Sequence, residues 1–243
     1  MLNTSLSIVV PFYNEEVALE ENLVTLFETL KSSGLRFELI LANDGSSDQS
    51  LKIASSFQAR HPSLIKLLSN DVNRGRGYVL KQAFLVASMD HLGYIDADLE
   101  IPEHHILELL EAMLSSGADV GVGDKTKPSA SKVRDFHRML ATKILNGLLG
   151  FCLNSKFSDH QCGLKIFKKE ALLSLLNKTN EDRWAFDTEL LLLAQRDNFA
   201  SVEIGVSLRR KRKSTVSVLK TGFMFLRKIV SFWKRGLRIQ RPS

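Results

Sequence analysis

Cysteine and long hydrophobic runs are scarce in this sequence. Among its 243 residues are two cysteines, Cys152 and Cys162, which could form at most one disulfide and have no partners at metal-ligand spacing. No run of about 20 apolar residues occurs, the length that a bilayer-spanning helix requires, and the amino terminus lacks the basic and apolar regions of a secretory signal. We therefore expect a chain of a reducing compartment, the cytoplasm, that does not cross a membrane.

Acidic residues are missing from the carboxy-terminal segment. Residues 209–243 contain 12 Lys or Arg and no Asp or Glu, whereas residues 1–208 contain 21 basic and 27 acidic residues and carry a net charge of −6. The overall charge of +6 therefore belongs to one end of the chain. A basic segment of this kind could bind an anionic membrane surface or the phosphate backbone of a nucleic acid.

The apolar pattern predicts one α/β domain in which strands and helices alternate. Strands are expected at residues 6–10, 37–41, 64–68, 92–95, 120–122, 164–167 and 202–208. Helices are expected at about residues 19–30, 50–59, 77–89, 102–114, 133–149 and 187–195. This alternation predicts a mostly parallel sheet covered by helices on both faces, with ligands bound beyond the carboxyl ends of its strands.

Two carboxylates, Asp96 and Asp98, directly follow the strand expected at residues 92–95. Residues two apart on an extended segment point to the same side, so both carboxylates could face one ligand. Such hard oxygen ligands suit Mg²⁺ or Mn²⁺, which complete their shells with water and phosphate oxygens. The same residues could instead cap the helix that is expected to open at Pro102.

Polar sequences also follow the three strands expected before this one: PFYNE at 11–15, NDGSSD at 43–48 and NRGRG at 73–77. Each has an ordinary explanation, namely a turn at Asp44, a helix cap at Asp48 and a tight bend at Gly75 and Gly77. Together, an aromatic side chain, a carboxylate, a basic glycine-rich loop and a carboxylate pair suit a nucleoside diphosphate.

In this order and spacing, PFYNEE, NDGSSD, NRGRG and DADLE resemble the nucleotide-binding half of family 2 glycosyltransferases. DHQCGLKIF at 159–167 and RWAFDTELL at 183–191 are similar to segments of dolichyl-phosphate β-glucosyltransferases, close relatives of dolichyl-phosphate mannose synthases. The resemblance covers roughly residues 5–217. It implies a GT-A fold, that is, a Rossmann-like, mostly parallel mixed sheet flanked by helices, and a donor that is UDP-glucose or GDP-mannose.

The resemblance also implies roles for individual residues. The nucleotide sugar would be bound by Pro11, Tyr13, Glu15, Asp44, Arg76 and Asp96. A Mg²⁺ or Mn²⁺ ion would be held by Asp96, Asp98 and Glu100. The acceptor phosphate would be contacted by Lys125, Arg138 and Thr142. The later motifs contribute Asp159, Gln161, Lys165, Arg209 and Lys213, and catalytic roles fall to Asp98, Asp187 and Arg138.

Several of these assignments have alternatives. Arg134 and Arg138 could form the solvated face of a helix, and Trp184 and Phe186 could pack in the core. The family has Ser-Lys where this sequence has Ser214 and Thr215, so the expected lysine is missing. It is therefore open which basic residue of 209–213 lies over the diphosphate.

Residues 218–243 have the pattern of a basic amphipathic helix that would lie on a membrane surface, following a GT-A domain at residues 1–217. Its apolar positions are Leu219, Phe223, Leu226, Ile229, Val230 and Trp233. The alternative is a terminal helix that docks on the body of the domain or on a second copy.

We expect an inverting hexosyltransferase, peripheral at a membrane, that acts on a polyprenyl or dolichyl phosphate and does not bind nucleic acid. An ionised acceptor phosphate would attack without a strong general base. One alternative is a transferase acting on a saccharide or protein hydroxyl, for which Asp187 would take the proton. A nucleic-acid-binding protein is the alternative from another class.

Overall fold

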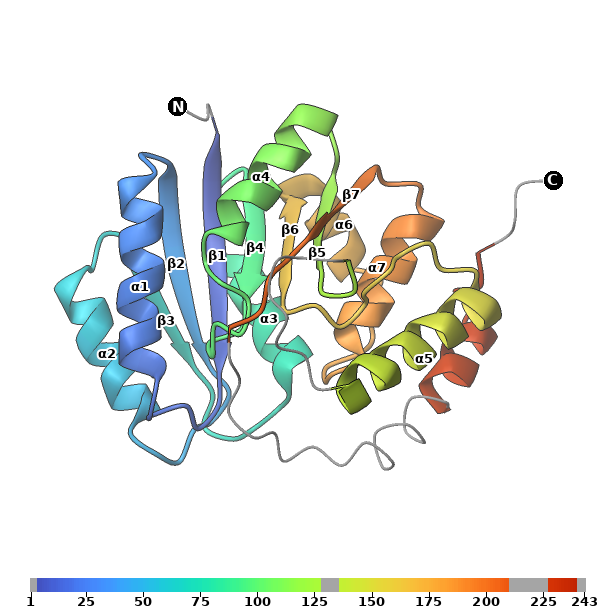
Figure 1. The fold of residues 1–243 in the computed structure, drawn as a ribbon. Helices are drawn as coiled ribbons and strands as arrows, with labels where there is room; N and C mark the ends of the chain where they lie inside the picture. Colours follow the sequence, from blue (N-terminus) through green and yellow to red (C-terminus); the bar gives the residue numbers. More distant parts are fainter. Residues whose placement is uncertain (1–3, 128–135, 210–226, 240–243) are drawn as a thin grey trace.

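Strands and helices alternate along the first half of the chain as the apolar pattern predicts. The computed structural model describes residues 4–127, 136–209 and 227–239, and for residues 136–143 the course of the backbone alone. The strands form one seven-stranded sheet in the order β3-β2-β1-β4-β6-β5-β7 (Figure 1). They are β1 (Ser5–Phe12), β2 (Arg36–Asn43), β3 (Ile65–Ser69), β4 (His91–Ile95), β5 (Val120–Asp124), β6 (Leu164–Lys168) and β7 (Ser201–Gly205).

Strand β6 runs antiparallel to both of its neighbours, β4 and β5, and the other pairings of the described sheet are parallel. The predicted mostly parallel mixed sheet is therefore confirmed. The register aligns the carboxyl ends of β1, β2 and β3, because Phe12 pairs with Asn43 and Asn43 with Ser69. On the other side of β1, the pairing of Ile95 with Leu164 brings the amino end of β6 to the carboxyl end of β4.

Helices cover both faces of the sheet and enclose two apolar cores. The helices are α1 (Leu19–Ser32), α2 (Ser50–Arg60), α3 (Arg76–Val86), α4 (His105–Ser116), α5 (Phe136–Leu153), α6 (Lys169–Leu176) and α7 (Phe186–Arg196). Helices α1, α2 and α4 pack on one face, where Ile8 is buried, and α3, α5, α6 and α7 pack on the other, where Val9 is buried. Alternate residues of β1 thus serve opposite cores, as expected for a strand covered on both sides.

Two details of the helices differ from the prediction. Helix α6 follows β6 without a loop, so no turn residue marks its start, although Leu172 and Leu175 have the spacing of a buried helical face. Helix α4 begins at His105 rather than at Pro102, and the proline lies in the turn before the helix.

The described end of the chain packs against the body of the domain. Residues 227–234 are helical, and Ile229, Phe232 and Leu237 are buried in the same core as α5 and α7. Two ion pairs reinforce this contact, Lys228 with Glu181 at 2.6 Å and Arg235 with Glu189 at 2.5 Å. The apolar positions predicted to share one helical face are therefore divided in the described part.

Within that part, Ile229 points inward, whereas Val230 and Trp233 are exposed. Leu219, Phe223 and Leu226 lie outside the described residues. Among the described residues, no helix combines the length and the apolar character needed to cross a bilayer.

Replacing Phe232 tests this docking. Its side chain is fully buried, so Phe232→Ala is expected to lower the free energy of unfolding by about 3 kcal/mol, through lost apolar burial and a residual cavity. Chemical denaturation followed by circular dichroism measures the effect. The neighbouring Trp233→Ala serves as the control, because that side chain is 54% exposed and its loss should change stability by less than about 0.5 kcal/mol. Equal losses in both variants would contradict the observed packing.

Candidate active site

The segment after β4 forms a turn that carries three carboxylates. The N–H of Leu99 donates to the carbonyl of Asp96 at 3.1 Å, and Leu99 has a positive φ of 43°. The expectation of an extended Asp96–Asp98 segment is therefore wrong, because the strand ends at Ile95 and the chain turns back at once. Asp98 is exposed and its Oδ1 accepts the N–H of Glu100 at 3.0 Å.

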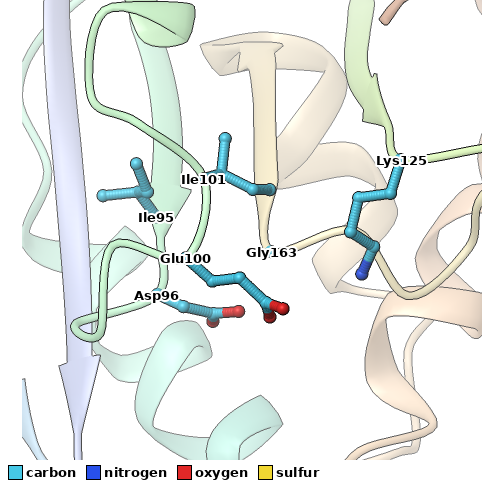
Figure 2. A pocket seen from close by; sticks show the side chains of 6 residues that line it. All are labelled: Ile95, Asp96, Glu100, Ile101, Lys125 and Gly163. Carbon is cyan, nitrogen blue, oxygen red and sulfur yellow. The ribbon is translucent and has the colours of Figure 1, made fainter. Parts of the chain in front are cut away.

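Asp96 and Glu100 line one pocket at the carboxyl end of β4, and Lys125 approaches it from the end of β5 (Figure 2). Gly163 forms another part of the wall, and a Cβ atom placed there would lie 1.9 Å from Oδ2 of Asp96. Only glycine therefore leaves room for the Asp96 carboxylate in this position. The antiparallel pairing of β6 with β4 brings Gly163 here, and the Asp96 N–H donates to the Gly163 carbonyl at 3.2 Å.

A partly buried ion-pair network lies beside this pocket. Arg76, the first residue of α3, donates to Asp96 Oδ1 at 2.7 Å and to Asp187 Oδ2 at 2.5 Å. The other oxygen of Asp187 accepts the hydroxyl of Tyr94 and lies 3.4 Å from Lys165 Nζ. The network thus joins α3, β4, β6 and α7 at the edge where substrates are expected.

The electrostatics of this network keep Arg76, Asp187 and Tyr94 in their usual charge states. Burial alone would lower the pKa of Arg76, but the charges of Asp187 and Asp96 outweigh it, so this pKa lies well above its usual value. Burial would raise the pKa of Asp187, and the cations of Arg76 and Lys165 hold it below its usual value. Burial and the Asp187 charge raise the pKa of Tyr94, which therefore stays a donor. Asp187 is consequently a weak base.

Lys165 is fully buried and fixes the loop before β6. Its ammonium donates to the carbonyls of His160 at 3.1 Å and Cys162 at 2.7 Å. In the same loop, Asp159 accepts the N–H groups of Lys125 and Gln161, each at 3.1 Å. The loop therefore joins β5 to the site through buried polar contacts.

The remaining contacts of this loop hold Lys125 and Gln161 in place. Lys125 Nζ donates to the carbonyl of Gln161 at 2.9 Å, and the Gln161 side chain donates to Thr188 at 2.9 Å. Burial alone would lower the pKa of Lys125, but nearby negative charge, above all that of Asp159, outweighs burial and raises this pKa, so the side chain stays an ammonium.

Asp44 ties the loop after β2 to the loop after β3. Its carboxylate accepts the N–H groups of Arg74 at 2.8 Å and Gly75 at 3.0 Å. Gly75 has a φ of 107°, and a Cβ atom there would lie 2.6 Å from the Asp182 carbonyl. The glycine-rich loop is thus set by conformation and close packing. Tyr13 is 46% exposed at the same edge.

Other predicted residues are placed as follows. Pro11 lies in β1 opposite Ala42, and the N–H of Glu15 donates to Ser50. Arg209 donates through its N–H to the Glu100 carbonyl at 2.8 Å and through its guanidinium to Glu103 at 2.6 Å, so it lies on the rim of the pocket. The side chains of Arg138 and Thr142, and the whole of Lys213, lie outside the described residues.

Comparison with known sequences decides the family. The sequence profile of glycosyl transferase family 2 matches residues 7–176. The chain belongs to this family. It is 34% identical over 216 residues to glycosyltransferase AglD of Haloferax volcanii, covering 88% of this chain and 34% of that protein. It is 28% identical over 245 residues to the dolichyl-phosphate beta-glucosyltransferase of Drosophila melanogaster, covering 96% of this chain and 75% of that protein.

The chain thus spans about a third of the length of the archaeal relative and three quarters of the insect one. Among solved structures, glucosyl-3-phosphoglycerate synthase of Mycobacterium tuberculosis, crystallised with Mn²⁺, uridine diphosphate and glucosyl-3-phosphoglycerate, superposes with a TM-score of 0.71 at 19% identity. The match covers 98% of this chain and 82% of that one. The predicted GT-A fold of this family 2 glycosyltransferase is confirmed.

The donor atoms of the site fit a hard divalent cation. Asp96 and Glu100 present carboxylates to one pocket, Asp98 lies on the same turn, and Gly163 leaves the space that Asp96 requires. The three carboxylates do not converge as tightly as a trio of side chains elsewhere in the described residues, His104, His105 and Glu108. In that trio, both ring nitrogens of His105 are already engaged by Glu108 and Ser207.

The sequence reasoning overlooked Tyr94 and Thr188 as members of the site. Tyr94 lies within a strand whose residues are all buried, and only its contact with Asp187, 93 residues away, shows that its hydroxyl is used. Thr188 lies next to Asp187 on α7, where a threonine has no distinctive pattern. Phe186 is fully buried, as its core-packing alternative predicts.

The buried His160 predicts a pH dependence of stability. Burial, with a contribution from the Lys165 charge, lowers the pKa of His160 from 6.5 to about 3. Between these values the unfolded chain binds a proton that the folded chain does not, so this contribution to stability is complete above about pH 6.5 and is lost as the pH falls. From pH 6.5 to pH 5, His160 should cost the native state about 2 kcal/mol, at about 1.4 kcal/mol per pH unit.

Urea unfolding at several pH values measures this slope. His160→Gln should flatten it between pH 6.5 and pH 5, whatever its effect at neutral pH. His104→Gln, which replaces an exposed histidine, is the matched control and should keep the slope of the unmodified chain. An unchanged slope in His160→Gln would show that this histidine is protonated in the folded protein.

Proposed function

We propose that this chain transfers a hexose from a nucleotide sugar to the phosphate of a polyprenyl or dolichyl phosphate, with UDP-glucose as donor, at the cytoplasmic face of a membrane. The pocket that Asp96 and Glu100 line opposite Lys125 is the observation that carries the proposal (Figure 2). The carboxylates suit a divalent cation with a pyrophosphate, and the ammonium suits an acceptor phosphate. GDP-mannose is the alternative donor.

Two similar proteins support the proposed transfer reaction. The insect relative is named for glucose transfer to dolichyl phosphate, and the mycobacterial structure holds Mn²⁺ and uridine diphosphate. Within the site, Asp96, Asp98 and Glu100 would hold Mg²⁺ or Mn²⁺. A bound cation of this kind supplies neutralisation for the charge that develops on the departing nucleoside diphosphate.

Residues around the pocket would bind and orient the donor. Arg76 keeps the Asp96 carboxylate in place and adds a positive charge at the edge of the pocket. The exposed ring of Tyr13 would pack on the nucleoside, while Asp44 fixes the glycine-rich loop beside it. Pro11 and Glu15 lie in the same loop cluster and complete the proposed nucleotide site.

A phosphate acceptor agrees with the state of Asp187. An acceptor phosphate has a second pKa near 6 and is largely ionised at neutral pH, so it can attack the anomeric carbon without a general base. A hydroxyl acceptor would need a base, and Asp187 is buried with a lowered pKa and bound to three donors. Asp187 would therefore position Arg76 while Lys125, with Arg138 and Thr142, addresses the acceptor. One-step displacement would invert the anomeric carbon.

Product analysis tests the proposed function. With radiolabelled UDP-glucose, Mn²⁺ and a polyprenyl phosphate in detergent, label should enter the organic phase. Asp96→Asn should lower this rate at least about 100-fold, because it removes charge from the proposed cation site. Glu111→Gln, at an exposed carboxylate of α4, is the matched control and should keep the rate. Transfer only to a saccharide or a protein would reject the lipid acceptor, and transfer only from GDP-mannose would replace the donor.

Gly163 gives a separate test of the cation site. In Gly163→Ala the new methyl group would displace the Asp96 carboxylate, whose Oδ2 lies 1.9 Å from the Cβ position. Mn²⁺ binding in the presence of uridine diphosphate, followed by electron paramagnetic resonance, should weaken about tenfold or more, the loss expected when support for a metal ligand is removed. Gly147→Ala, where a Cβ atom meets nothing within 4 Å, is the control. Unchanged Mn²⁺ affinity in Gly163→Ala would exclude Asp96 as a ligand.

A further inference from the structure

Helix α5 and residues 227–234 lie beside each other (Figure 1), and both carry exposed large apolar side chains. The exposed fractions are 56% for Ile144 and 79% for Phe151 on α5, and 51% for Val230 and 54% for Trp233 on the terminal helix. Between the two helices runs a groove of about 930 Å³, lined by side chains that include Phe151, Val230, Trp233 and Ile239. We call this surface the α5–terminal face. Exposed apolar groups gathered in this way mark an interaction surface.

The charge around this face is of one sign. Neither α5 nor residues 227–239 contain an aspartate or a glutamate. Lys228 and Arg235 are bound to carboxylates of the body, whereas Arg227, Lys234 and Arg238 are exposed and pair with no carboxylate of the described residues. Exposed cations and exposed apolar side chains therefore occur together in the terminal segment.

The α5–terminal face is connected to the loop that holds the site residues. Asn146 of α5 donates to the Ser158 carbonyl at 2.7 Å and accepts the His160 N–H at 3.4 Å. Asp159 lies between these two contacts and, as described above, holds Lys125. The α5–terminal face is thus linked through one loop to the pocket from which Lys125 is expected to reach an acceptor.

We propose that the α5–terminal face docks on a bilayer with anionic headgroups. Phe151 and Trp233 enter the boundary between headgroups and acyl chains, and Arg227, Lys234 and Arg238 contact lipid phosphates. Aromatic and aliphatic groups interspersed with exposed cations match such a surface, which is apolar below a layer of negative charge. This proposal deepens the proposed function, because it names the surface that would bring the site to a lipid acceptor, and docking needs neither donor nor acceptor.

Vesicle binding without any substrate tests the proposal. The chain should sediment with vesicles of phosphatidylcholine and phosphatidylglycerol and bind much more weakly to phosphatidylcholine alone. The double variant Phe151→Ser, Trp233→Ser should bind the anionic vesicles at least tenfold more weakly. Leu85→Ser and Val17→Ser, at residues 67% and 74% exposed elsewhere on the surface, form the matched control and should bind like the unmodified chain. Equal binding of both double variants would overturn the proposal.

Two further measurements test the contribution of the cations to binding and the insertion of Trp233 into the bilayer. Replacing Arg227, Lys234 and Arg238 by glutamine should weaken binding to anionic vesicles about 100-fold, since each cation near such a leaflet contributes about one factor of five. The chain has two tryptophans, so in a Trp184→Phe background the emission of Trp233 should shift to the blue and be quenched by brominated lipids. Unquenched emission while the chain is bound would place the contact elsewhere and overturn the proposal.

Two further outcomes separate docking from the other possibilities. With a water-soluble short-chain prenyl phosphate as acceptor, the double variant Phe151→Ser, Trp233→Ser should keep the transfer rate of the unmodified chain. If the unmodified chain binds vesicles but transfers no sugar, the proposed function is refuted and the docking proposal is not. If the chain is a dimer that the same double variant dissociates, the face is an interface between copies, and the docking proposal fails.

Discussion

The arrangement of the site depends on one buried carboxylate, Asp187, and the cations that neutralise it. Arg76 and Lys165 approach its two oxygens from different elements, and Tyr94 donates a third hydrogen bond. Lys165 is fully buried, so removing its counterion would leave an uncompensated charge in the interior, which typically costs about 3–5 kcal/mol. The four elements that carry these residues are therefore held in one relative position. The candidate site at the carboxyl end of β4 depends on this arrangement.

The network also determines what the neighbouring groups can do. Arg76 uses one side of its guanidinium for Asp187 and the other for Asp96, so the proposed cation ligand is oriented by a residue that is itself fixed. Lys165 fixes the carbonyls of His160 and Cys162, and through that loop Asp159 holds Lys125. The groups proposed to bind the sugar donor and those proposed to bind the acceptor are thus positioned by the same buried charge, although they come from opposite sides of the pocket.

The sequence predicted the strands and the loops of the site because these depend on local patterns. The apolar run before Asp96 determines where β4 ends, and parallel pairing then brings the polar loops to one edge. The turn at Leu99 could not be predicted, since a positive φ at leucine is not indicated by the residue itself. The surroundings of Asp187 depend on contacts 22 and 93 residues apart along the chain, which a local pattern does not record.

The basic residues of the terminal segment do not all serve one purpose. Lys228 and Arg235 are matched by Glu181 and Glu189 of the body, and Phe232 is buried in the core, so part of the local pattern serves folding. From the sequence, all of these positions belong to one amphipathic helix whose apolar side could face a membrane or the domain. The structure divides them, with Phe232 toward the domain and Trp233 toward solvent. Adjacent residues on a helix point about 100° apart, so one short helix can pack on the domain with one side and face a membrane with another. The side that faces outward is then too small to dock alone, and the proposed membrane contact needs the apolar side chains of α5 as well.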